Sequence, residues 1–102
     1  MGTCAIIKVE GLDGVALYKH WDGNPESTRP WLESFNKDFA ENRGDDPQYK
    51  MAQLIRSSAF DCEKFNLDSS KVTGWGVIPA LNGFPNWTAN YTYILNSDGT
   101  VT

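Results

Sequence analysis

The only histidine of this chain lies in a short polar and aromatic segment, Tyr-Lys-His-Trp-Asp-Gly-Asn-Pro-Glu at positions 18–26. A histidine titrates near neutral pH, so His20 next to the carboxylate of Asp22 or Glu26 has the groups of a general base. Alternate residues of a strand point to opposite faces, and His20 shares a face with Asp22 only where the strand continues that far. The other interpretation is a surface histidine beside a turn formed by residues 22–25.

The sequence lacks the other groups that a catalytic or metal site needs. No serine or cysteine stands in a recognisable nucleophile elbow, and the glycines do not form a phosphate-binding loop that leads into a helix. Cys4 and Cys62 have neither CxxC spacing nor a histidine nearby in the sequence, so we expect two reduced, mostly buried thiols and no zinc. We therefore predict no catalytic residues, no metal and no cofactor.

A second group of aromatic residues lies in the glycine- and asparagine-rich C-terminal half. Its members are Trp75, Phe84, Trp87, Tyr91 and Tyr93. Glycines beside aromatic rings let the backbone approach a planar ligand closely, and the rings can stack on it. Basic residues at the rim, such as Lys19, Arg29 or Lys71, would let such a pocket hold a nucleotide-like molecule although the whole chain is acidic. The simpler alternative is that these rings fill the core.

From the histidine segment and the aromatic group we predict one ligand-binding surface. Its residues are Tyr18, His20, Trp21, Asp22, Arg29, Trp75, Trp87 and Tyr91.

Composition and charge exclude several classes of partner. Of the 102 residues, 40% are hydrophobic and 22% charged, as in an ordinary folded protein, and this length supports a single domain over residues 1–102. The net charge of −4 opposes direct binding to nucleic acid, whose partners usually carry positive surfaces. The apolar runs are too short to cross a membrane and the N-terminus has no signal peptide, which predicts a cytoplasmic protein without membrane contact.

The histidine segment must be positioned by a hairpin and a helix. Alternating apolar residues predict strands at residues 5–9 and 15–20 around a glycine turn at residues 11–14. The first helix is expected to begin at a cap formed by Ser27 or Thr28 and to end near residue 43.

A second helix is expected to begin at the Asp-Asp-Pro sequence of residues 45–47 and to end near Ser58. The remaining expected elements are strands at residues 74–79, 91–95 and 100–102, a loop with one turn of helix at residues 60–72, a turn-rich loop at residues 80–87, and a hairpin turn at residues 96–99. The fold class is therefore α+β: a small antiparallel sheet formed by the N- and C-terminal hairpins, with two helices packed on one face.

Residues 3–40 resemble a family of small proteins encoded by bacteriophages and mobile elements. In that family a short N-terminal hairpin leads into Tyr/His/Trp-Asp-Gly-Tyr-Pro-Glu and then a helix. The residues that match in order are Ala5 to Ile7, the turn at Asp13-Gly14 and the segment from Tyr18 to Glu26. Asn24 stands where the family has an aromatic residue. The resemblance implies a phage-type accessory protein of the host cytoplasm and suggests counter-defence as its setting, without implying an activity.

We therefore expect a non-enzymatic accessory protein that sequesters a small nucleotide-like signal. The first alternative is an inhibitor that binds a host defence protein through an acidic surface. The second alternative is a small enzyme that uses His20 with Asp22 or Glu26. Each of the three is compatible with a homo-oligomer.

Overall fold

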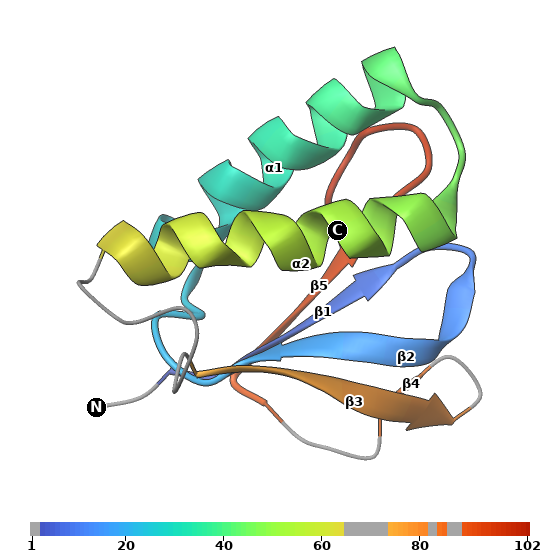
Figure 1. Cartoon of the computed structure of the whole chain (residues 1–102). Coiled ribbons are helices and arrows are strands. Elements are labelled where there is room, and N and C mark those ends of the chain that lie inside the picture. The colour runs from blue at the N-terminus through green and yellow to red at the C-terminus, as the bar shows by residue number, and fades with distance from the viewer. Residues whose placement is uncertain (1–2, 65–73, 82–83, 86–88) are drawn as a thin grey trace.

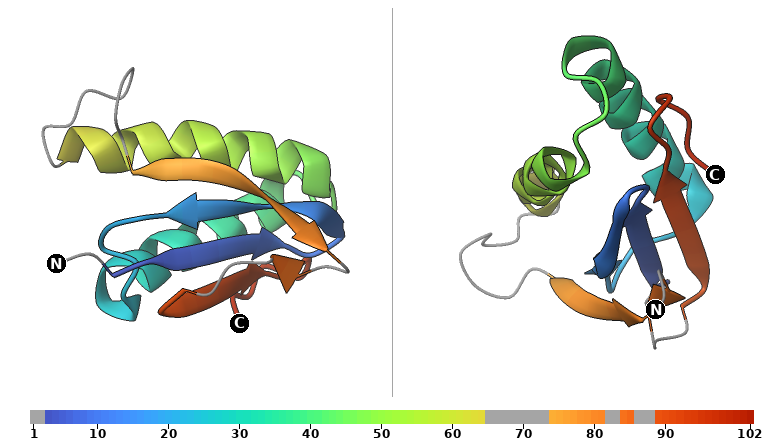
Figure 2. Two further views of the ribbon diagram at one scale, coloured as in Figure 1. Left: turned by 90° about the horizontal axis from the view of Figure 1, so that it is seen from below. Right: turned by 90° about the vertical axis from the view of Figure 1, so that its right-hand side faces the viewer.

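The computed structural model of the chain describes residues 3–64, 74–81, 84–85 and 89–102 (Figure 1). The elements in chain order are β1 (Ala5–Val9), β2 (Leu12–Lys19), α1 (Pro25–Asn42), α2 (Pro47–Lys64), β3 (Trp75–Leu81), β4 (Phe84–Pro85) and β5 (Tyr91–Leu95). The strands form one five-stranded sheet in the order β4-β3-β2-β1-β5, and both helices lie on the same face of it (Figure 2). The predicted α+β fold class is confirmed.

The N-terminal hairpin is confirmed, with a shorter turn than expected. Strand β2 begins at Leu12 rather than at residue 15, because Val9 pairs with Leu12 across a two-residue connection. Gly11 supports that tight turn with a φ of +91°, which a residue with a Cβ rarely adopts. The register shifts between the Ile7–Leu17 and Val9–Leu12 pairs, and the extra residues of this irregularity lie on the β2 side.

The expectation that the sheet is antiparallel throughout is wrong for one pair of strands. Strand β5 runs parallel to β1, with Ala5 opposite Tyr91 and Val9 opposite Leu95. A tight turn fixes an antiparallel direction only for strands that follow each other in the chain, and β1 and β5 are separated by both helices. The C-terminal turn itself is as predicted, since it returns the chain so that Val101 bridges Leu95 in antiparallel fashion.

Helix α1 begins earlier than the sequence predicts. Asn24 is the N-cap residue, with extended backbone angles, and a proline occupies the first helical turn behind it. Ser27 and Thr28 are therefore already inside the helix. Instead of capping, the buried Thr28 donates its hydroxyl proton to the carbonyl of Asp22 at 2.7 Å, which ties the helix to the segment before it.

Helix α2 begins where predicted and ends six residues later. Asp46 caps it by accepting the N–H of Tyr49 at 3.4 Å. The helix continues past Ser58 to Lys64, because the intervening residues include good helix formers and no glycine or proline. The segment of residues 60–72, expected to be a loop with one turn of helix, is helical over its first five residues as the continuation of α2, and the rest of it lies outside the described residues.

The segment after α2 also has more strand than expected. Strand β3 continues through Pro79, which was expected to end it, and reaches Leu81. The two-residue strand β4 pairs with the end of β3 inside the segment of residues 80–87, which was expected to be a loop. A short antiparallel return of this kind depends on its partner strand and carries little local signal.

The main core lies between the sheet and the two helices. Its buried members are Ala5, Ile7, Val9, Leu17, Leu32, Met51, Leu54, Tyr93 and Leu95. A smaller cluster of Ile6, Ala16 and Ile78 is buried on the opposite face of the sheet. Strand β1 is buried on both faces, in keeping with a sequence that is apolar except for the buried Lys8. Within the described part of the chain, neither helix is long and apolar enough to cross a membrane.

Candidate functional site

The sheet divides the residues that were predicted to form a single ligand-binding surface. Side chains alternate between the two faces of a strand. Tyr18 packs against the small cluster on the face away from the helices, and His20 lies on that side within hydrogen-bond distance of its hydroxyl. Trp75 packs into the main core, and Tyr91 stacks on Tyr93 of that core. Among the described residues, Trp75 and Tyr91 therefore do not line one pocket with Tyr18 and His20.

The most concentrated group of reactive side chains is a triangle of Cys4, Tyr18 and His20. The Tyr18 hydroxyl lies 2.8 Å from Nδ1 of His20 and 3.2 Å from Sγ of Cys4. Sγ of Cys4 and Nδ1 of His20 are themselves 3.9 Å apart. Cys4 and Tyr18 are half-buried and His20 is exposed, so the triangle lies at the surface of the sheet.

Cys4 is a member of this site that the sequence analysis missed. The thiol was expected to have no histidine near it, because His20 is sixteen residues away in sequence. The hairpin brings the two together, since Cys4 and His20 flank Ala5 and Lys19, which are paired across β1 and β2. The predicted strands already contained this signal, because pairing them end to end places residue 4 opposite residue 20.

The single hydroxyl proton of Tyr18 serves one neighbour at a time. If Tyr18 donates its proton to Sγ of Cys4, Nδ1 of His20 can donate a hydrogen bond to the phenol oxygen. If Tyr18 donates to Nδ1 of His20 instead, Nδ1 is the acceptor. The hydrogen bond to Cys4 raises the pKa of Tyr18 above its ordinary value, and burial raises it further. Tyr18 is therefore a neutral hydroxyl at physiological pH, able to donate one hydrogen bond and to accept another.

Trp21 forms an aromatic surface next to this triangle. Its ring meets the His20 ring edge-on, with 5.2 Å between centroids, and 40% of the residue is exposed. The indole also lies against Gly74, where an added Cβ would overlap with Cε3 of Trp21. Gly74 also accepts the N–H of His20 at 2.7 Å through its carbonyl. The indole is thus held in place while a large part of it faces solvent.

The corner after Trp21 brings the chain back over the start of β1. Asp22 has a φ of +55°, and it is the only non-glycine residue with a positive φ in the part of the chain described. Gly23 does not have a positive φ, and what it requires is space. A Cβ there would lie 2.6 Å from the Cβ of Ala5 and 2.8 Å from the carbonyl oxygen of Thr3.

The carboxylates proposed as partners of His20 lie apart from it. No hydrogen bond or ion pair joins His20 to Asp22 or Glu26 within the described ranges. The carboxylate of Glu26 accepts a hydrogen bond from Asn24 at 3.1 Å, and that bond holds the pKa of Glu26 below its ordinary value. The histidine is therefore paired with a phenol and a thiol instead of with a carboxylate.

Arg29 and Trp75 make structural contacts on the helix side of the sheet. The Arg29 guanidinium donates to the carbonyl of Val101 at 3.0 Å and lies over the ring of Tyr93. Trp75 meets Trp31 of α1 edge-on, with 5.6 Å between ring centroids. These contacts pack the second turn of α1 and the start of β3 against the core.

Tyr91 remains a partly exposed aromatic residue on β5, the strand at one edge of the sheet. It is 40% exposed, and its ring stacks on that of Tyr93 with 6.4 Å between centroids. Trp87 and Lys71 lie outside the described residues, and the side chain of Phe84 does too.

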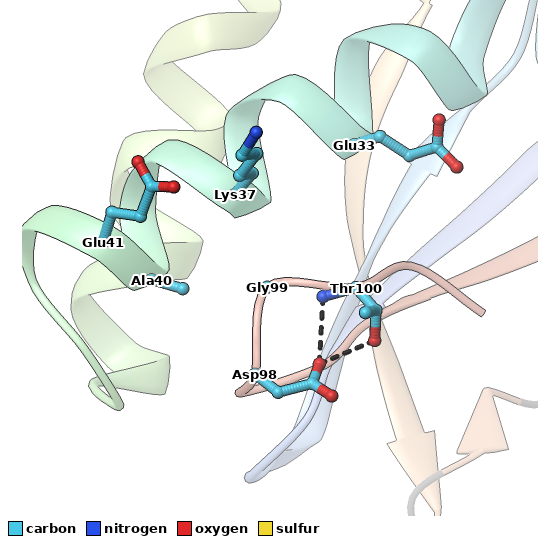
Figure 3. A pocket seen from close by; sticks show the side chains of 7 residues that line it. All are labelled: Glu33, Lys37, Ala40, Glu41, Asp98, Gly99 and Thr100. Carbon is cyan, nitrogen blue, oxygen red and sulfur yellow. Dashed lines mark hydrogen bonds between the residues drawn. The ribbon is translucent and has the colours of Figure 1, made fainter.

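A separate cavity of about 500 Å³ lies between α1 and the C-terminal turn (Figure 3). Its lining residues are Glu33, Lys37, Ala40, Glu41, Asp98, Gly99 and Thr100. The Asp98 carboxylate accepts hydrogen bonds from the hydroxyl and the N–H of Thr100, which lower the pKa of Asp98. Three carboxylates and one lysine thus give this cavity an acidic character that the sequence analysis did not localise.

The comparisons with known proteins identify no relative: no family model matches the chain, and neither a curated protein nor a solved structure matches it.

Proposed function

We propose that this chain is a non-enzymatic binding protein that holds a small planar, nucleotide-like ligand at the corner formed by His20 and Trp21. The observation that carries this proposal is the half-exposed indole of Trp21, fixed between His20 and Gly74 before any ligand arrives. A preorganised aromatic ring loses little conformational entropy when a ligand stacks on it, so more of the stacking free energy appears as affinity.

The neighbouring imidazole supplies a polar contact for the same ligand. Nδ1 of His20 is engaged by the Tyr18 hydroxyl at 2.8 Å, which leaves Nε2 of this exposed ring to meet a ligand group. An aromatic surface beside a ring nitrogen suits a ligand with a flat apolar part and a polar edge, as a nucleobase has. The similarity of residues 18–26 to small phage proteins supports counter-defence as the setting, with the ligand a small host signal that the protein sequesters.

Isothermal titration calorimetry against a panel of cyclic and linear nucleotides tests this proposal. We expect saturable binding to the wild type, weakened about 5- to 150-fold in Trp21→Ala, which corresponds to about 1–3 kcal/mol of lost stacking. Tyr49→Ala is the matched control, because Tyr49 is exposed to a similar extent, 42%, on α2. Binding that is equally weakened by both substitutions, or no binding by any nucleotide in the panel, would refute the proposed site.

A second candidate function is inhibition of a basic host defence protein, and the acidic cavity between α1 and the C-terminal turn favours it. Glu33, Glu41 and Asp98 surround that cavity with Lys37 as the one cation in its lining. Such a surface would speed the approach of a positively charged partner and favour it over acidic proteins. If this function holds, the Glu33→Lys and Glu41→Lys double variant loses the partner in pull-downs from host lysate, while Asp13→Lys on the β1–β2 hairpin keeps it.

The enzymatic alternative has the weakest support. It requires His20 beside Asp22 or Glu26, whereas the imidazole is hydrogen-bonded to Tyr18. A screen for hydrolase and transferase activity tests it, and activity lost in His20→Ala with the fold intact would restore it.

A further inference from the structure

The contacts around Cys4 place its thiol at one end of a short chain of proton-exchanging groups. The Tyr18 oxygen stands between the two others, 3.2 Å from Sγ of Cys4 and 2.8 Å from Nδ1 of His20. Such distances allow a proton to pass from sulfur to oxygen and from oxygen to nitrogen without movement of the backbone. Sγ of Cys4 and Nδ1 of His20 are 3.9 Å apart, so the positive charge that forms on His20 when it takes the proton lies beside the reacting sulfur.

The backbone holds these groups in position on both sides. The N–H of Cys4 donates to Oδ1 of Asn90 at 2.9 Å, and its carbonyl accepts the N–H of Tyr91 at 3.3 Å. On the other strand, Tyr18 packs against the buried cluster around Ile6, and His20 is tied by its N–H to Gly74. The thiol is half-buried, so it is both held in place and open to a small reagent.

We propose that Cys4 is a nucleophilic modification site for small soft carbon electrophiles, activated by the relay from its thiol through Tyr18 to His20. The relevant electrophiles are α-halo amides and α,β-unsaturated carbonyl compounds, which react with thiolates and hardly with thiols. This inference is independent of the proposed ligand. It depends on Nδ1 of His20, which contacts Tyr18, and not on the indole of Trp21.

With an α-halo amide, the sulfur of Cys4 attacks the carbon that bears the halogen. The sulfur–carbon bond forms as the carbon–halogen bond breaks, and the halide leaves with the bonding electron pair. The thiol proton passes to the Tyr18 oxygen while the Tyr18 hydroxyl proton passes to Nδ1 of His20. The products are a thioether on Cys4, a neutral Tyr18, an imidazolium at His20 and a halide ion, so atoms and charges balance.

The test uses Cys62→Ser, which leaves Cys4 as the only thiol, and iodoacetamide as the probe at neutral pH. The rate constant of Cys4 alkylation is followed by mass spectrometry for the folded chain and for the same chain unfolded in denaturant, with a small model thiol correcting for the effect of denaturant on the reagent. We expect the folded chain to react about tenfold faster or more, because Tyr18 and His20 take up the thiol proton as the sulfur attacks. An equal or slower rate in the folded chain would overturn the proposal, and this comparison needs no substitution within the triangle.

Variants then separate the relay from simple exposure of the thiol. Tyr18→Phe removes the connecting hydroxyl and His20→Gln removes the proton acceptor, and each is expected to bring the rate of the folded chain to that of the unfolded one. Tyr49→Phe removes a phenol far from Cys4 on α2 and is expected to keep the full rate. The proposal is overturned if His20→Gln, shown by circular dichroism to be folded, keeps the wild-type rate.

Discussion

The hydroxyl of Tyr93 on β5 donates a 2.7 Å buried hydrogen bond to the carbonyl of Gly23, seventy residues earlier in the chain. This bond joins the edge of the sheet to the corner that follows Trp21. Burial is the main cause that raises the pKa of Tyr93 above its ordinary value, so the phenol stays protonated and keeps donating. The position of the proposed ligand site therefore depends on a residue that no ligand would touch.

Tyr93→Phe tests that dependence. The substitution keeps the buried ring and leaves the Gly23 carbonyl without its donor, which costs about 1–3 kcal/mol of unfolding free energy. Urea denaturation measures the loss, and the slope of the transition should stay the same. An unchanged midpoint would show that the bond does not stabilise the corner.

Gly23→Ala should destabilise the protein by about 1–3 kcal/mol through overpacking. The added Cβ would lie 2.8 Å from the backbone nitrogen of Ala5 and from the carbonyl oxygen of Thr3, and backbone atoms cannot rotate away. Gly14→Ala is the matched control, because a Cβ there meets no described atom within 4 Å and its φ is not positive. Equal denaturation midpoints for the two variants would contradict the close approach at Gly23.

Asp22 and Gly23 illustrate what could be predicted from sequence. Turn-forming residues after Trp21 indicate a corner correctly, but they do not distinguish a residue with positive φ from one with no room for a Cβ. Here Asp22 has the first property and Gly23 the second. The distinction depends on β1, which lies about twenty residues earlier and meets the corner only in the folded protein.

The same difference between local and distant signals explains which other parts of the fold could be predicted. The N-terminal hairpin and both helices follow from local periodicity and turn chemistry, and their existence was predicted correctly. The parallel pairing of β5 with β1 was not predicted, because the direction of β5 is set by the return of the chain from α2 and β3. Cys4 was overlooked for a related reason: its partner His20 is distant in sequence and adjacent only across the hairpin.

Asn36 is predicted to hold the C-terminal turn against α1. Its buried side-chain nitrogen donates to the carbonyls of Asn96 at 2.9 Å and Thr100 at 2.8 Å, and Lys50 donates to the same Asn96 carbonyl. Asn36→Leu removes both donors, which should cost about 2–4 kcal/mol in unfolding free energy. In hydrogen-exchange measurements on this variant, the amide of Thr102 should lose protection before the amides of β1. An equal loss of protection at all these amides would argue against a local role of Asn36 in holding the C-terminal turn.

Stability should decrease as the pH falls from neutral into the acid range. The N–H of Ser97 binds the Glu10 carboxylate and lowers the pKa of Glu10, and hydrogen bonds from Thr100 lower that of Asp98. A carboxyl group whose pKa is lower in the folded state stabilises that state above its unfolded pKa and stops doing so as pH falls through its folded pKa. Denaturation midpoints measured against pH should therefore fall more gently in Asp98→Asn, and an identical slope would rule out this contribution.

A nuclear magnetic resonance titration with the tightest-binding nucleotide of the panel tests the proposed site most directly. The indole N–H signal of Trp21 and the ring protons of His20 should shift saturably. The indole signals of Trp31 and Trp75, which pack edge-on in the core, should stay in place. Saturable shifts at Trp75 with Trp21 unmoved would contradict a ligand site at the Trp21 corner.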